Sequence, residues 1–385
     1  MFIKNDLRIP KIVLLPLVFV ALVAVIAGGR LLFAPECYTI RERVPQEGSQ
    51  GYRTWYGENL KSFYHRNRTM CIPDGWRAIG AIETGDGWAR YERDKTGIMI
   101  REHSFSERRL TFKDSSYAVT LLYPKDTSEY LLKAYARVIE NAFNRTGSLF
   151  GDEGDAVIEH TVLVTAGLGG AHPEAPLIYP DPRESVTVFV RSPYDTRAEE
   201  LLIHAVVHLY NRFRTDFTGY QKNQSPLQAA DFQELEATWA ETAFRSSSAG
   251  RESRLAYLYT VHIAVKTGNF DLITGPPFDN KQEFENITPS VVVPRDASEL
   301  DIQYGHYVLA PLALVAVDGL LYEAGAPATV EKILTKIHAG EADNLFEELA
   351  RYFDDEELNT IWRWMSEGET IPLELIENAS AHYRQ

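Results

Sequence analysis

The chain has 385 residues, of which 45% are hydrophobic and 24% are charged, and its formal net charge is −15. This length is sufficient for one large domain or two lobes with sizeable cores. The acidic excess argues against a nucleic-acid partner, because binding to phosphates needs a basic surface.

The N-terminal segment has the composition of a membrane anchor. Residues 12–28 carry no charge, and the apolar stretch continues to residue 33 after a single arginine, Arg30, whose long side chain can reach the lipid headgroups. This is about the length of a bilayer-spanning helix. Basic residues lie in segment 1–11, so we expect a single-pass membrane protein with a cytoplasmic N-terminus and an extracytoplasmic domain. A cleaved signal peptide, with residues 25–27 at the cleavage site, is the alternative.

The two cysteines, Cys37 and Cys71, follow this segment. They are too few for a disulfide framework or for a zinc site built from cysteines. One disulfide outside the cytoplasm and two unpaired thiols both fit the sequence.

The rest of the chain is mixed α/β first and then all α. Residues 34–75 are polar without a sustained period and are expected to be a linker. Short β-prone runs follow, among them 117–123, and Ser128 then begins a helical pattern. Two further strands are predicted at 159–165 and 185–191, separated by a loop rich in Gly and Pro.

The second half of the sequence predicts a series of helices. A helix over 196–214 is apolar nearly all round in its middle, which indicates a buried helix. Further helices are predicted over about 231–246, 252–266, 304–324 and 328–338, with Gly325 as a stop and two short helices within 342–367. The expected organisation is an anchor (1–33), a linker (34–75), an α/β lobe (76–214) and a helical lobe (215–385).

The buried helix contains the sequence His204-Ala-Val-Val-His208. Histidines four residues apart project from one helix face, so both imidazoles are able to reach a single zinc ion. In the H-E-x-x-H motif the residue after the first histidine is a glutamate that acts as general base. Here that residue is Ala205. A chance pair of histidines satisfied by hydrogen bonds is the alternative.

The helix that follows is both acidic and aromatic. Glu234, Thr238 and Glu241 share one face by their spacing. One carboxylate on such a face is able to bind a metal, and another is able to contact a histidine ligand of that metal and orient it. A solvated charged face is the alternative.

These two helices together resemble those of gluzincin metallopeptidases, the group that includes thermolysin and many zinc aminopeptidases. The resemblance rests on Glu200-Leu-Leu-Ile-His-Ala-Val-Val-His-Leu-Tyr210 and on Gln233-Glu-Leu-Glu-Ala-Thr-Trp-Ala-Glu241. It implies Zn2+ as the cofactor, held by His204, His208 and Glu234. Leu235 departs from the glycine that is usual at that position, so Glu236 remains an alternative ligand.

The resemblance also implies residues around the metal. Members of the group often present a Tyr or His to the oxyanion of the reaction, and Tyr304 and then His306 are the candidates here. The strand before the metal helix would align an extended substrate along its edge, through Val186, Val188 and Val190.

The resemblance covers roughly residues 115–365 and implies an α+β, zincin-like two-lobe fold. The expected function is that of a membrane-anchored extracytoplasmic zinc metallopeptidase acting on peptides or proteins. The chain is expected to be inactive or very slow, because Ala205 cannot accept a proton. The alternatives are a non-catalytic pseudopeptidase that binds proteins or peptides, and a structural membrane protein with an incidental histidine pair.

Overall fold

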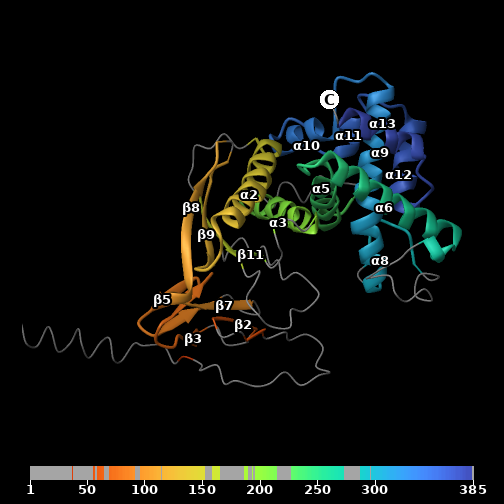
Figure 1. Ribbon diagram of the computed structural model, residues 1–385. Coiled ribbons are helices and arrows are strands. Elements are labelled where there is room, and N and C mark those ends of the chain that lie inside the picture. The colour runs from red at the N-terminus through yellow and green to blue at the C-terminus, as the bar shows by residue number, and fades with distance from the viewer. Residues whose placement is uncertain are drawn as a thin grey trace, which may run out of the picture. The chain divides into compact units, whose positions relative to one another are not determined.

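The computed structural model describes residues 37, 55–56, 59–64, 69–91, 96–113, 115–151, 158–164, 186–189, 193, 196–214, 227–272, 287–294 and 296–383. Within it the chain forms two compact units (Figure 1). The smaller comprises Met1–Tyr56 and Lys61–Met99, and the larger comprises Gly57–Leu60 and Ile100–Gln385. The predicted anchor, 12–33, lies outside the described residues.

The smaller unit is built from short strands. Its described strands are β1 (Trp55–Tyr56), β2 (Leu60–Tyr64), β3 (Thr69–Cys71), β4 (Trp76–Ile79), β5 (Glu83–Gly85), β6 (Trp88–Arg90) and β7 (Thr96–Arg101). They form one sheet in the order β1-β2-β7-β4 and another in the order β3-β6-β5. Met70, Ala89, Tyr91 and Met99 form the core of this unit.

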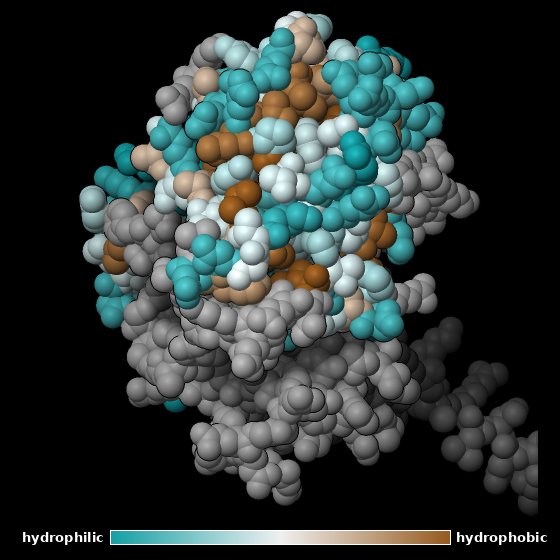
Figure 2. Space-filling model, turned by 90° about the vertical axis from the view of Figure 1, so that its right-hand side faces the viewer, coloured by the Kyte–Doolittle hydropathy of each residue, from teal (hydrophilic) through white to brown (hydrophobic). Residues whose placement is uncertain are grey.

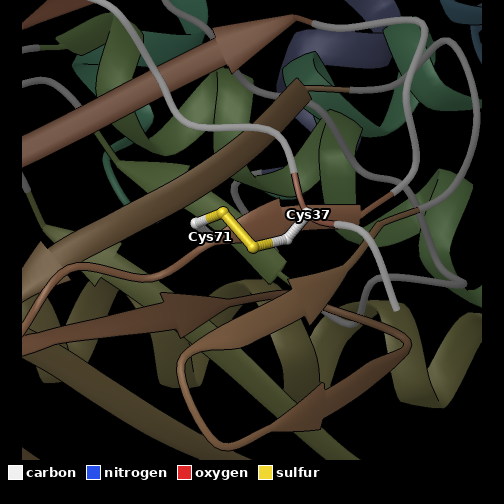
Figure 3. Close-up of a disulfide and its surroundings, with 2 residues drawn as sticks. All are labelled: Cys37 and Cys71. Atoms are coloured by element: carbon white, nitrogen blue, oxygen red, sulfur yellow. A yellow bond between two sulfur atoms is a disulfide. The ribbon is translucent and has the colours of Figure 1, made fainter. Parts of the chain in front are cut away.

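The smaller unit differs from the organisation expected from the sequence, in which residues 34–75 are a linker. Part of segment 34–75 forms strands rather than a linker, and the unit ends near residue 99 rather than at 75. The strands of this segment are two to five residues long, too short to show a sustained period in the sequence, and β3 pairs with β6 rather than with a neighbouring strand. Figure 3 shows the disulfide between Cys37 and Cys71, which confirms the pairing over the free thiols.

The larger unit begins with a four-stranded sheet. Its strands are β8 (Phe105–Thr111), β9 (Tyr117–Pro124), β10 (Ile158–Val164) and β11 (Val186–Phe189), in the order β11-β10-β9-β8. A short 3-10 turn, η1 (Glu102–Ser104), precedes β8. Strand β8 is antiparallel to β9, whereas β9, β10 and β11 are parallel. A parallel pair needs a crossover connection, and helix α2 (Glu129–Leu149) provides it between β9 and β10.

Helices α2 and α3 connect this sheet to the helical half. Ser128 caps α2, as its sequence predicts, by accepting a hydrogen bond from the Leu131 amide. Helix α3 spans Thr196–Arg214, the predicted range. Tyr210 of α3 packs against Tyr117 of β9 with ring centroids 4.9 Å apart, and against Phe150 just after α2. Aromatic packing therefore holds α3, the helix that carries His204 and His208, against the sheet.

The helical half follows in the expected order, with one addition. Its elements are α5 (Ala229–Ala243), α6 (Ser248–Thr267), η2 (Phe270–Leu272), α8 (Glu299–Tyr304), η3 (Gly305–Leu309, a π-helical turn), α9 (Ala310–Glu323), α10 (Val330–His338), α11 (Leu345–Leu349), α12 (Asp355–Glu367) and α13 (Leu373–His382). Helix α13 lies beyond the last predicted helix. Gly325 follows α9 with a φ of 59°, which fits its predicted role as a stop.

Helix α9 lies at the centre of this half, beside α5, α12 and α13 (Figure 1). Among the described residues, Glu299–Glu323 is the one stretch long and apolar enough to cross a membrane, and 89% of its most apolar window is buried inside the protein. Figure 2 shows one face of the molecule, where hydrophobic residues form small separate patches among hydrophilic ones. Scattered patches of this kind are ordinary for a folded domain.

Gly319 allows α13 to lie directly against α9. A Cβ added at this position would lie 2.2 Å from the Leu375 carbonyl oxygen. Gly319→Ala is therefore expected to lower the free energy of unfolding by about 1–3 kcal/mol, as overpacking does. Gly250→Ala in α6 is the matched control, because its Cβ would have no neighbour closer than 3.4 Å. Urea denaturation of both variants measures the difference, and equal stabilities would contradict the expectation.

Candidate metal centre

Polar contacts join α3 to α5 along much of their length. Arg245 Nη1 lies 2.7 Å from Glu200 Oε1, Glu241 Oε1 lies 2.7 Å from His204 Nδ1, and Asn211 donates to Glu236 at 3.0 Å. The partners run in opposite directions along the two helices, so α3 and α5 are antiparallel neighbours. This register places Glu234 beside the histidine pair.

His204, His208 and Glu234 form a cluster with metal-ligand composition. One donor atom from each lies within 4.8 Å of the other two. The two histidine Nε2 atoms are 3.0 Å apart, and Glu234 Oε1 lies 3.2 Å from His208 Nε2. Glu234 Oε2 lies 3.6 Å from His204 Nε2. The three side chains are 14%, 16% and 27% exposed respectively, so the cluster is sheltered but open to small molecules.

Charges around the cluster favour a cation at its centre. Burial alone would raise the pKa of Glu234, but its hydrogen bond to His208 and the nearby histidine charges lower it to about 2. Burial likewise opposes protonation of His204, whereas Glu241 and Glu234 together raise its pKa above the ordinary value. The Glu234 carboxylate is therefore ionised at neutral pH and favours positive charge beside it.

The donor set fits zinc. His204 Nδ1 faces Glu241, so its Nε2 is the nitrogen that lies toward His208 and Glu234. Without metal, shared protons hold the three groups together; a zinc ion would replace those protons, and each group would then supply it with one electron pair. In a tetrahedral zinc site with bonds of about 2.0–2.1 Å, neighbouring donors are about 3.3 Å apart. The spacings of 3.0, 3.2 and 3.6 Å are close to that value.

The alternative ligand Glu236 is engaged elsewhere. Its side chain is fully buried, one oxygen is paired with His338 of α10, and the other accepts from Asn211. The structure therefore brings Glu234, and not Glu236, to the two histidines. Two residues along a helix differ by about 200° in direction, which explains why the two carboxylates serve opposite sides of α5.

Ala205 is fully buried beside the cluster. Its methyl group neither accepts nor donates a proton. At the position where the H-E-x-x-H motif has its base, the site therefore offers none.

The π-helical turn η3 decides which aromatic residue faces the cluster. The sequence predicted one continuous helix with Tyr304 as the first candidate. Instead, Tyr304 is fully buried, and its hydroxyl lies 2.7 Å from His262 Nδ1. His306, the second candidate, lies with its Nε2 3.1 Å from Asp231 Oδ1, one turn before Glu234. Neither is one of the three converging residues.

Tyr307 is the site residue that the sequence did not single out. Its ring stacks on the His204 ring with centroids 5.7 Å apart, and the residue is 38% exposed. Burial of the hydroxyl, and then the charges of Glu234 and Glu241, raise its pKa well above the ordinary value. It therefore remains protonated at neutral pH and is able to donate a hydrogen bond.

Gly305 was the available signal for this departure from helix geometry. A Cβ there would lie 2.2 Å from the Ser290 carbonyl oxygen, so the close approach requires glycine. Single π turns within helices frequently occur at functional sites. The wider π turn changes the direction of the side chains within it, so Tyr307 rather than Tyr304 lies over His204.

The contact between His262 and Tyr304 predicts a loss of stability in acid. His262 is fully buried, and its Nε2 accepts a hydrogen bond from the Ile371 amide. Burial lowers its folded-state pKa to about 4. The unfolded chain, with a histidine pKa of about 6.5, therefore takes up a proton first as the pH falls.

This contribution to stability is complete above about pH 6.5 and is lost progressively toward pH 4. The difference between the folded and unfolded pKa values of His262 corresponds to about 3 kcal/mol in the free energy of unfolding. The expected result is a wild-type free energy of unfolding that falls more steeply over this range than that of His262→Gln. Urea titrations at several pH values measure both slopes, and parallel slopes would exclude this role for His262.

Strand β11 is an edge strand of the described sheet, the position at which an extended substrate would be able to align. Val186 and Val188 belong to it, paired in parallel with Thr161 and Leu163 of β10. Val190 lies outside the described residues. The alignment of a substrate along β11 remains a prediction.

No protein-family model and no curated protein matches the sequence. Solved structures resemble the fold. An aminopeptidase N family protein from Idiomarina loihiensis matches with a TM-score of 0.53 and 11% identity, over 84% of this chain and 62% of that one. An M1 zinc metallopeptidase from Deinococcus radiodurans matches with a TM-score of 0.41 and 12% identity, over 87% and 70%. Yeast LTA4 hydrolase in complex with bestatin matches with 0.48 and 10%, over 83% and 52%.

This chain therefore spans less than two thirds of the length of the Idiomarina protein. At such low identity the likeness is one of fold. Both the order of elements, a mixed sheet followed by helices, and the paired helices that hold the cluster agree with the resemblance seen in the sequence. The chain therefore shares the fold of the Idiomarina aminopeptidase N family protein.

Proposed function

We propose that this protein binds one zinc ion through His204, His208 and Glu234 and binds peptides beside it. The observation that supports this most strongly is the convergence of two imidazole nitrogens and a carboxylate oxygen within 4.8 Å. Zinc in such a site supplies a Lewis acid for a carbonyl oxygen and a polarised water. The solved structure with the matching fold is an aminopeptidase N family protein, which is consistent with a peptide as the ligand.

The chain's own residues determine how far hydrolysis proceeds. Glu241 keeps His204 oriented through its 2.7 Å contact with Nδ1, and Tyr307 offers a protonated hydroxyl near Glu234. Ala205 leaves the attacking water without a proton acceptor. The rate of peptide hydrolysis is therefore expected to be about 10²–10⁴-fold lower than that of a protein with a base at this position.

Ala205 also favours a second candidate function, a pseudopeptidase that binds peptides or proteins without cleaving them. The two functions share the zinc site and differ in turnover. Detectable zinc-dependent hydrolysis by the unaltered chain would favour the enzyme, whereas peptide binding without turnover would favour the binding protein.

We further propose that this domain lies outside the cytoplasm and is attached to the membrane by segment 12–33. The disulfide between Cys37 and Cys71 supports this location, because disulfides are rare in cytosolic proteins. Fractionation of cells, with protease added outside intact cells, tests it. Protection of the domain until the membrane is broken would contradict it.

Metal analysis tests the zinc site directly. We expect one zinc per chain by elemental analysis after dialysis, and an anomalous difference peak at the zinc edge among the three side chains. Because a ligand that binds only the folded state stabilises it, chelation is expected to lower the melting temperature. A metal-free protein whose melting temperature does not respond to added zinc would overturn the proposed function.

A further inference from the structure

Arg254 of α6 lies on the far side of the carboxylate that orients His204. Glu241 Oε1 is 2.7 Å from His204 Nδ1, and its other oxygen, Oε2, is 3.4 Å from Arg254 Nη2. The three side chains form a continuous line from the metal cluster to a guanidinium group. Each oxygen of Glu241 thus has one partner.

The ion pair between Arg254 and Glu241 is mostly buried, which strengthens the attraction between the two charges. The Glu241 side chain is 4% exposed and that of Arg254 is 14% exposed, so little water screens the charges. Among the described residues, Arg254 is the one Lys or Arg that forms an ion pair with Glu241. A buried carboxylate that loses its cationic partner loses much of its stabilisation, and it is then free to turn away from the histidine.

The orientation of His204 depends on Glu241, because the 2.7 Å contact at Nδ1 holds the ring so that Nε2 faces the cluster. Partners of this outer kind typically change metal affinity by about 10–100-fold when they are lost. Arg254 contacts neither histidine, and its other partner is the Tyr257 ring, 5.9 Å from the guanidinium carbon to the ring centroid. Its effect on the metal would therefore pass through Glu241.

We propose that Arg254 is a positioning residue for the metal site, which holds Glu241 against His204 and so tightens zinc binding. The inference rests on the proposed function, because it assumes that the cluster binds zinc. It adds a third helix, α6, to the two that supply the ligands.

The test is a competition titration of zinc, against a chromogenic chelator, with the purified full chain and its variants. Arg254→Gln is expected to weaken zinc binding by about 10-fold or more, and Arg254→Lys to recover part of the loss because it restores the charge. Glu241→Gln should weaken binding as well. If Arg254 acts through Glu241, the double variant should be little weaker than Glu241→Gln alone, since coupled residues are not additive.

Arg251, one turn earlier on the same helix, provides the matched control. It donates to the backbone oxygens of Ala243 and Tyr383, at 3.1 and 3.0 Å, and therefore has a structural role. Arg251→Gln is expected to lower the melting temperature and leave zinc affinity within about 2-fold, which is below the loss expected for an outer partner of the metal.

A spectroscopic measurement separates positioning from general loss of structure. Visible absorption of the Co2+-loaded protein reports on the ligands, and we expect altered bands in Arg254→Gln but not in Arg251→Gln. Additive losses in the double variant, equal weakening by both arginine variants, or unchanged zinc affinity in Arg254→Gln would each overturn the inference. If the unaltered chain bound no zinc, the proposed function itself would fail, and that result is distinguishable from these three.

Discussion

Replacing Ala205 with glutamate is expected to raise zinc-dependent peptide hydrolysis by about 10²–10⁴-fold, the usual contribution of general acid–base catalysis. Position 205 directly follows a histidine of the cluster and lies on the helix that carries both. A carboxylate there would accept the proton of a water activated at the metal. The measurement is kcat/KM on a broad library of quenched-fluorescent peptides and on aminoacyl substrates, with and without chelator.

Ala205→Gln is the control for this experiment. Glutamine has the size of glutamate without the basic carboxylate, so it tests the cost of a larger side chain at a position that is fully buried. We expect it to leave hydrolysis at the low level of the unaltered chain. If Ala205→Glu folds and binds zinc but still cleaves nothing, the catalytic interpretation fails and the binding function remains.

Glu234→Gln and Glu236→Gln are expected to have opposite consequences, although the two residues are neighbours on α5. Glu234→Gln removes the anionic donor of the cluster and should weaken zinc binding by more than about 100-fold, since loss of an outer partner alone costs about 10–100-fold. In the metal-free protein this substitution also removes a carboxylate whose pKa the histidines lower to about 2. Some loss of stability at neutral pH is therefore expected as well, so zinc affinity is the measurement that distinguishes the two variants.

Glu236→Gln changes a fully buried carboxylate that is paired with His338 and Asn211. Removing one partner of a buried hydrogen bond costs about 1–3 kcal/mol, and zinc affinity should remain nearly unchanged. Urea denaturation of the metal-free proteins and zinc titrations separate the two effects. If Glu236→Gln were the variant that loses zinc, the assignment of Glu234 as the ligand would be wrong.

The structure also explains which parts of the site were accessible from the sequence. His204 and His208 lie on one helix, where spacing alone fixes their relative positions. The start of α2 at Ser128 and the end of α9 before Gly325 are likewise local, because capping and a positive φ depend on a few neighbouring residues.

The other features depend on contacts between elements that are distant in the chain. The sequence allowed either Glu234 or Glu236 as the third residue, and the register of α5 against α3 resolves the choice. Tyr307 lies within η3, whose π-helical geometry turns its ring onto His204, and Gly305 at the start of η3 is packed closely against Ser290. Strands β1 and β3 of the smaller unit are too short for a periodic pattern, and β3 pairs with β6 across two intervening strands.

The sequence by itself therefore determined the helix that presents two imidazoles, the absence of a base at position 205 and the general order of strands and helices. Local periodicity encodes these features, because each turn of a helix repeats every 3.6 residues. Only the tertiary structure decided which carboxylate joins the imidazoles, which tyrosine lies over them and which arginine supports them. Those choices depend on how whole helices pack against one another. Successive side chains along a helix differ in direction by about 100°, so a small change in packing brings a different residue to the site.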